Sequence, residues 1–170
     1  MPHVVVEIAK MTLTRILLPT DFSDTAQYAL DYARELAGRF DATVHLLHVV
    51  PDPLQTLAVE VAPVVSDLAA SWTADAERRL EEVRIEGPRT VRAVRVGHAF
   101  VEILRYAADN AIDLIVMGTH GRGPVEHLLL GSDAEKGVRK ASCPVLTVKQ
   151  AGHVFVMPGL PAPSAPEPAT

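Results

Sequence analysis

A glycine-rich segment in the second half of the chain has the residue types that bind phosphate. Its pattern is G-x2-G-x9-G-S, which begins at Gly118 and Gly121 and ends at Gly131 and Ser132. Glycines let the main chain approach a ligand closely and adopt positive φ angles. Gly131 and Ser132 are expected to open a helix, where unpaired N–H groups and the helix dipole favour an anion. The segment differs from a Walker A loop, because no Gly-Lys-Ser or Gly-Lys-Thr ending supplies a lysine.

Other side chains of this segment bear on the same hypothesis. Arg122 supplies a mobile positive charge and His120 a potential partner for phosphate, although a solvent-facing loop histidine needs no ligand. Ser132 has two alternative roles, because Glu135 three residues later would complete a capping box with it. Asp133 suits the first turn of a helix but would repel a polyphosphate unless a divalent cation such as Mg2+ bridged the two. Taken alone, the segment therefore fits either a phosphate site, in which Asp133 disfavours a bare polyphosphate, or a turn whose glycines bind no ligand.

A second polar segment follows the first apolar run and reads Pro19, Thr20, Asp21, Phe22 and Ser23. Ligands of open α/β sheets bind beyond the carboxyl ends of the strands. A carboxylate at such an end, Asp21, suits the hydroxyl groups of a ribose. The alternative for Asp21 is an Asx-type turn at the start of the first helix. Ser23 is the expected N-cap of that helix.

Alternating periodicities predict the elements that position these two segments. Continuous runs of branched apolar residues suit parallel strands buried on both faces, whereas residues 91–96 alternate charge and valine, as a half-exposed edge strand does. Apolar residues three and four apart predict helices between the strands. The resulting β-α-β-α-β-α-β-α-β order implies right-handed crossovers onto an open five-stranded parallel sheet with helices on both faces. The expected strands are 16–18, 44–50, 91–96, 112–117 and 144–148, and the expected helices 26–40, 68–83, 101–111 and 132–142, with an irregular connection over 51–67.

Composition excludes several classes of protein. Of the 170 residues 48% are apolar, which is enough to build a full core without a metal or a disulfide. A net charge of −5 argues against nucleic-acid binding, and no apolar stretch approaches the length of a membrane span. The single cysteine, Cys143, fits a reducing compartment and is expected to be a packing residue. Because the N-terminus also lacks the pattern of a signal peptide, we expect a cytoplasmic protein.

The chain is expected to divide into three parts. Residues 1–12 form an N-terminal extension, residues 13–150 the folded domain, and residues 151–170 a proline- and alanine-rich disordered tail. Within the domain, His45 and His48 lie three apart on an expected strand and therefore point to opposite faces. Neither a cysteine pair nor an H-E-x-x-H motif accompanies them, so we expect no zinc site.

Five segments in order resemble the universal stress protein family. The resemblance runs from Arg15 to Lys149, about four-fifths of the sequence, and the G-x2-G-x9-G-S spacing is typical of the ATP-binding branch of that family. It implies a Rossmann-like sheet of order 3-2-1-4-5, with ATP bound across the ends of strands one and four. The five segments are RILLPTDFS, VHLLHV, DLIVMGTHGRG, LLLGSDAEK and CPVLTVK.

The resemblance also implies roles for single residues. Asp21 would lie by the ribose or adenosine, and Val49 would meet the edge of adenine through its main chain. Met117 and Gly118 would flank the nucleoside, while the later glycines and Ser132 would hold the phosphates. The complete predicted nucleotide site is Pro19, Thr20, Asp21, Val49, Met117, Gly118, His120, Gly121, Arg122, Gly131, Ser132 and Asp133.

Taken together, these features predict a regulatory protein that binds an adenine nucleotide, and the resemblance alone implies a role in stress adaptation. The expected ligand is ATP, or AMP or ADP, with Mg2+ as an accompanying ion. The resemblance further implies a homodimer that pairs through Val145–Val148, an apolar edge strand that would otherwise be exposed, and a protein partner of unknown identity. Two alternatives stay open. One is a weak ATPase or phosphotransferase, for which no positioned lysine or obvious base is present, and the other is a dimeric interaction module without nucleotide.

Overall fold

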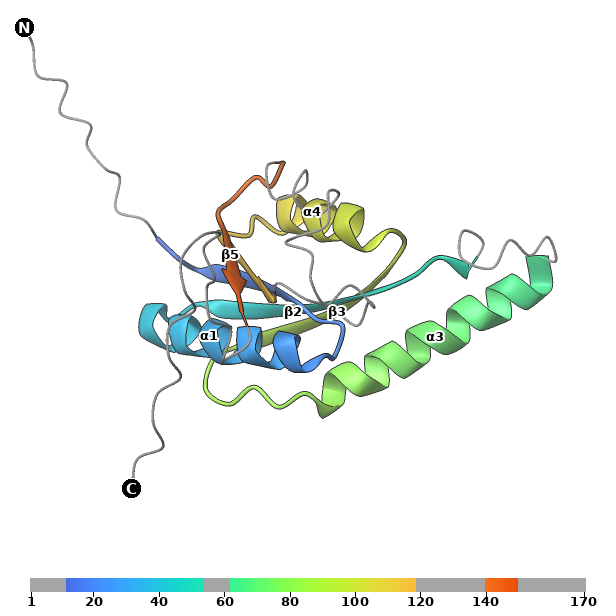
Figure 1. Cartoon of the computed structure of the whole chain (residues 1–170), viewed down its shortest axis with the longest axis horizontal. Coiled ribbons are helices and arrows are strands. Elements are labelled where there is room, and N and C mark those ends of the chain that lie inside the picture. Colours follow the sequence, from blue (N-terminus) through green and yellow to red (C-terminus); the bar gives the residue numbers. More distant parts are fainter. Residues whose placement is uncertain (1–11, 54–61, 119–139, 150–170) are drawn as a thin grey trace, which may run out of the picture.

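The predicted strands form one parallel sheet, which confirms the expected fold class. The computed structural model describes residues 12–53, 62–118 and 140–149. The strand order is β3-β2-β1-β4-β5, and every neighbouring pair is parallel. The strands are β1 (Arg15–Pro19), β2 (Thr43–Val50), β3 (Thr90–Val96), β4 (Leu114–Gly118) and β5 (Val145–Val148), and the described helices are α1 (Asp24–Phe40), α3 (Ala62–Glu82) and α4 (Ala99–Asp109) (Figure 1).

Helices cover both faces of this sheet. In Figure 1, α1 and α3 lie on one face and α4 lies on the other. Because successive side chains of a strand point to alternate faces, β1 and β2 each contribute to two separate cores. Leu18 and Leu46 pack in the core under α1 and α3, and Leu17 and Leu47 pack in the core under α4. Within the described ranges, no helix is long and apolar enough to cross a membrane.

β3 is an edge strand, as its alternating sequence predicts. It pairs with β2, and Val91 and Val96 are 43% and 45% exposed. Arg92 fastens this edge to the end of α3, because its guanidinium donates hydrogen bonds to the carbonyl oxygens of Leu80 (2.9 Å) and Val83 (2.8 Å). Leu80 lies in the last turn of α3 and Val83 follows the helix directly, so Arg92 supplies donors to carbonyls at the end of a helix.

Two predicted boundaries are wrong by more than two residues. The irregular connection expected over 51–67 is shorter, because α3 begins at Ala62 and accommodates Pro63 in its first turn, where proline costs no hydrogen bond. The helix expected over 132–142 does not reach its predicted end, since residues 140–142 are not helical. The remainder of that helix lies outside the described residues, as do residues 1–11 of the predicted extension and the predicted tail at 151–170.

Asp113 joins the beginning of β1 to the beginning of β4. Its Oδ2 accepts hydrogen bonds from the N–H (2.8 Å) and hydroxyl (2.7 Å) of Thr14 and from the N–H of Arg15 (2.9 Å). Burial opposes ionisation of Asp113, but these hydrogen bonds outweigh it and hold the pKa of the carboxyl below its usual value. The two strands then pair from Ile16 and Leu114 onwards, so their carboxyl ends lie side by side.

Candidate functional site

A cavity of about 200 Å3 lies where β1, β2 and β4 end. Parallel strands bring their carboxyl ends to one edge of the sheet, which collects residues that are distant in sequence. All the predicted nucleotide-contacting residues that the structure describes line this cavity, namely Pro19, Thr20, Asp21, Val49, Met117 and Gly118. The other six predicted residues, His120, Gly121, Arg122, Gly131, Ser132 and Asp133, lie outside the described residues.

α4 contributes cavity residues that the sequence analysis missed. Ala99 and Ile103, one turn apart on α4, line the cavity together with Leu47 of β2. Ala99 begins the helix directly after Gly97 and His98, which follow the end of β3. The rule that directed attention to the segments after β1 and β4 applies equally to the segment after β3, and it would have found Ala99.

Thr20, the first residue after β1, is fixed by hydrogen bonds in three directions. Its N–H donates to the carbonyl oxygen of Leu47 (2.8 Å), and its Oγ1 accepts from the N–H of Phe22 (3.0 Å). Its carbonyl oxygen pairs with Nδ1 of His48 (2.7 Å). Since a carbonyl oxygen can only accept, Nδ1 of His48 carries a proton. The turn from β1 into α1 therefore follows a fixed main-chain path along the cavity.

Phe22 completes this turn in a conformation that is uncommon for its type. Its φ is 61°, in the left-handed region that large side chains rarely adopt, at a typical cost of ~1–3 kcal/mol. The Phe22 ring packs against the imidazole of His48 with ring centroids 4.6 Å apart. The guanidinium carbon of Arg79, from α3, lies 3.9 Å from the centroid of the Phe22 ring. Contacts from β2 and α3 thus offset the strain in the turn.

Asp21 shows the Asx-type turn that the sequence left as an alternative. Its Oδ1 accepts hydrogen bonds from the N–H (3.0 Å) and the hydroxyl (2.6 Å) of Ser23. Ser23 is the N-cap of α1, as predicted, and its Oγ accepts from the N–H of Ala26 (3.2 Å). Asp21 also lines the cavity, so one carboxylate both orients the cap of α1 and borders the space available to a ligand.

Gly118 is needed for a close approach rather than for an unusual backbone angle. A Cβ atom at Gly118 would lie 2.7 Å from Cγ2 of Thr25 and 3.1 Å from the carbonyl group of Thr25. Thr25 is buried in the first turn of α1. The positive φ expected at Gly118 is wrong, because Gly118 is a regular β4 residue without one. The absence of a side chain brings the end of β4 against the start of α1 beside the cavity.

Val49 presents its peptide groups to the cavity because β1 ends before β2 does. The last paired residues of these two strands are Pro19 and Leu47, and β2 continues to Val50 beside β3 only. Peptide groups of a strand alternate in direction, so those of Val49 point to the same side as those of Leu47. The carbonyl of Val50 points the other way, since it accepts from the N–H of Gly97 across the end of β3 (2.9 Å). The N–H and C=O of Val49 therefore face the side that β1 has left.

The two strand histidines point to opposite faces, as predicted. Nδ1 of His45 lies 3.0 Å from the hydroxyl of Tyr106 under α4, while His48 contacts the turn after β1. Burial, together with the charge of Arg15, lowers the pKa of His45. Among the described residues no group of three histidine, cysteine or acidic side chains is arranged to hold a metal ion.

Cys143 packs against the core under α4, in keeping with the packing role expected for it. Burial and the nearby carboxylate of Asp113 raise the pKa of its thiol. A raised pKa favours the thiol over the nucleophilic thiolate.

Comparison with known proteins agrees with this architecture. The universal stress protein MJ0531 of Methanocaldococcus jannaschii is 35% identical over 139 residues, covering 80% of this chain and 82% of the relative. The solved structure of MJ0577, from the same organism, is 31% identical with a TM-score of 0.72, and covers 84% of this chain and 99% of that chain.

Two less similar structures share the fold alone. One is a universal stress protein in complex with cAMP, at 21% identity and a TM-score of 0.55. The other is the universal stress protein from Archaeoglobus fulgidus in complex with dAMP, at 19% identity and a TM-score of 0.53. The sequence model of the universal stress protein family matches residues 12–149. This chain therefore belongs to the universal stress protein family.

Proposed function

We propose that this protein binds an adenine nucleotide in the cavity at the ends of β1, β2 and β4 and acts as a cytoplasmic regulator in stress adaptation. The observation that carries the proposal is the direction of the Val49 peptide groups. An N–H and a C=O that face a mostly apolar cavity form a donor and acceptor pair for the edge of a planar base. Two structures with the same fold, in complex with cAMP and dAMP, support adenine as that base.

The cavity is large enough for only part of a nucleotide. A volume of about 200 Å3 is below the ~300–1,000 Å3 of clefts that enclose a whole ligand, so it suits the base and the sugar. Asp21 at its border would accept hydrogen bonds from ribose hydroxyls. The phosphates would then extend past Gly118 towards the glycine-rich segment, where Arg122 and Ser132 are available as partners. Because Asp133 follows Ser132, we propose that Mg2+ accompanies ATP.

The proposal is tested by the nucleotide content and affinity of the purified protein. Mass spectrometry after denaturation would identify any nucleotide carried through purification, and calorimetry would measure the Kd for ATP with Mg2+ and with EDTA. We expect an adenine nucleotide, tighter ATP binding with Mg2+ than with EDTA, and a rise in melting temperature with ATP. Multiple turnovers of ATP to ADP would identify an ATPase instead. Absence of both bound nucleotide and stabilisation by ATP would disprove the proposal.

A pair of variants on α4 locates the binding. Ala99 lines the cavity and is exposed, so Ala99→Phe would fill the space for the base without entering a core. We expect at least a tenfold loss of ATP affinity with an unchanged fold. Ala108→Phe places the same ring at another exposed position of α4, away from the cavity, and should bind ATP like the wild type. Equal effects of the two variants would place the nucleotide elsewhere.

A further inference from the structure

α3 takes no part in lining the cavity, yet one of its side chains reaches the turn that does. Arg79 lies in the last turn of α3, and its guanidinium carbon is 3.9 Å from the centroid of the Phe22 ring. The same ring packs on His48, whose Nδ1–H donates to the carbonyl oxygen of Thr20. Arg79, Phe22 and His48 are here named the Phe22 stack. The stack connects α3 to the cavity, which both His48 and Thr20 line.

We propose that the Phe22 stack positions the turn at Thr20 and Asp21 for nucleotide binding and couples α3 to the occupancy of the cavity. This inference rests on the proposed function, and it adds a regulatory element to the same site. Arg79 comes from α3, Phe22 from the turn after β1, and His48 from β2. Together they join the helix layer to the end of the sheet. Phe22 is a positioning residue, since it acts on the cavity through Thr20 and His48. His48 lines the cavity itself and also holds the carbonyl oxygen of Thr20.

The turn depends on these contacts because of its backbone strain. A φ of 61° at Phe22 is held only while neighbouring groups stabilise it. The ring contacts with His48 and Arg79, together with the hydrogen bond from the Phe22 N–H to Thr20 Oγ1, provide that stabilisation. A displacement of α3 would withdraw Arg79 from the ring, and the strain would then favour a different path for the residues that border the cavity.

The hydrogen bonds of Thr20 imply that nucleotide binding and the observed position of α3 favour each other. Thr20 is fixed to β2 through both its N–H and its carbonyl, and the second of these bonds requires the imidazole donor of His48. Thermodynamic linkage makes any such coupling reciprocal. A nucleotide that orders the turn would hold Arg79 and α3 in place, and a partner that moves α3 would weaken nucleotide binding.

Substitutions at His48 separate positioning from simple packing. The amide nitrogen of asparagine can occupy the place of a histidine Nδ1, so His48→Asn keeps a donor to Thr20, whereas His48→Leu removes the donor and keeps apolar bulk. We expect His48→Leu to bind ATP about 5–10-fold more weakly than the wild type, as the loss of one hydrogen bond implies. His48→Asn should remain within about twofold of the wild type.

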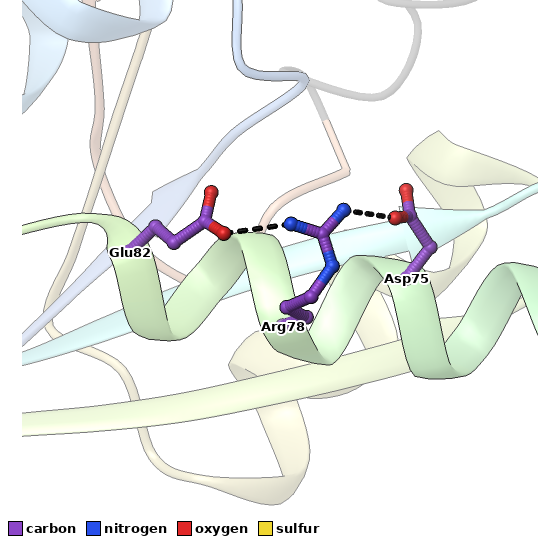
Figure 2. A network of polar contacts seen from close by, with 3 residues as sticks. All are labelled: Asp75, Arg78 and Glu82. Carbon is purple, nitrogen blue, oxygen red and sulfur yellow. Dashed lines mark hydrogen bonds and ion pairs between the residues drawn. The ribbon is translucent and has the colours of Figure 1, made fainter.

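Arg79 has a matched control in the preceding residue. Arg78 forms exposed ion pairs with Asp75 and Glu82 on the surface of α3 (Figure 2). Arg79→Gln and Arg78→Gln therefore remove the same charge from adjacent positions of one helix. We expect Arg79→Gln to weaken ATP binding about 2–5-fold, as the loss of a cation–π contact implies, and Arg78→Gln to leave it unchanged.

The outcomes distinguish this inference from the proposed function. If the wild type binds ATP but His48→Leu and His48→Asn are equally weak, or Arg79→Gln and Arg78→Gln are alike, the Phe22 stack has no positioning role. If the wild type binds no adenine nucleotide, the proposed function fails. Hydrogen exchange at the Phe22 amide then tests by itself whether the Phe22 stack positions the turn. Exchange that is about tenfold faster in His48→Leu and restored in His48→Asn supports it, and unchanged exchange in both variants refutes it.

Discussion

At the cavity, the glycine pattern correctly predicts the position of Gly118, but the physical role of this glycine differs from the predicted one. The spacing of glycines directed attention to Gly118, and Gly118 lines the cavity, but its role is the contact with Thr25 rather than a positive φ. The residue in the left-handed region is Phe22, whose type gives no warning of it. Its ring contacts His48 and Arg79, which are distant in sequence, so local pattern alone does not predict its conformation.

Gly118→Ala tests the close approach of β4 and α1. The new Cβ would clash with Thr25, and Thr25 is too buried to move freely, so we expect a loss of about 1–3 kcal/mol in the free energy of unfolding. Urea denaturation measures this loss. Gly38→Ala is the matched control, because a Cβ there meets no atom within 4 Å and the position is helical. It should raise stability by about 0.5–1 kcal/mol. A neutral Gly118→Ala would contradict the role assigned to the contact.

The sequence predicts an element well where its local pattern fits only one kind of structure. This holds for three of the strands but not for the start of α3. The runs behind β1, β2 and β4 are continuous because both faces of the sheet are covered, and this burial makes them recognisable. The sequence does not reveal the start of α3, because the prolines at positions 51, 53 and 63 are also typical of a loop. Proline in the first turn of a helix is compatible with either structure, so composition could not decide between them.

The clamp at Asp113 stabilises the pairing of β1 with β4 in a pH-dependent way. The carboxylate accepts three hydrogen bonds, and its folded-state pKa is lowered below 3.8. The stabilisation is therefore complete above about pH 3.8 and is lost as the pH falls through the lower folded-state value. We expect Asp113→Ala to lower the free energy of unfolding at pH 7 by about 1–3 kcal/mol, and the difference from the wild type to shrink in acid.

Chemical denaturation at several pH values measures this difference. Asp109→Ala removes an exposed carboxylate from the end of α4 and should change stability by less than about 0.5 kcal/mol at any pH. If the two variants lose stability equally, or if the deficit of Asp113→Ala does not shrink as acid protonates the carboxyl, the clamp does not act through its ionised carboxylate.

At the scale of the whole molecule, the sequence predicts family membership and strand order. Both predictions rest on the five segments that resemble the universal stress protein family and follow one another in the same order. The family resemblance implies a homodimer through Val145–Val148. In the structure β5 is an edge strand of the sheet, and Leu146 is 37% exposed. The dimer itself stays a prediction. The cavity wall from α4 and the Phe22 stack could not be predicted, because both depend on how helices pack across the sheet.

Leu146→Lys tests the dimer. A charged side chain on the exposed face of β5 would have to be buried on pairing, so we expect sedimentation analysis to show a wild-type dimer and a monomeric variant. Val101→Lys introduces the same charge at a 48% exposed position on α4 and should leave the association state unchanged. A wild-type monomer, or a Leu146→Lys protein that still dimerises, would exclude β5 as the interface.

The arginines of β3 bear on how far such an assembly can grow. Two sheets joined edge to edge through β5 would end on both outer sides at β3. There Arg92 donates to carbonyls at and just after the end of α3 on one face, while the guanidinium carbon of Arg95 lies 5.6 Å from the Tyr106 ring centroid of α4 on the other. A third chain that added its strand to this margin would have to approach between two cations and disturb both attachments. In the predicted dimer, this margin would therefore disfavour the addition of further strands, so that association would end at a closed pair.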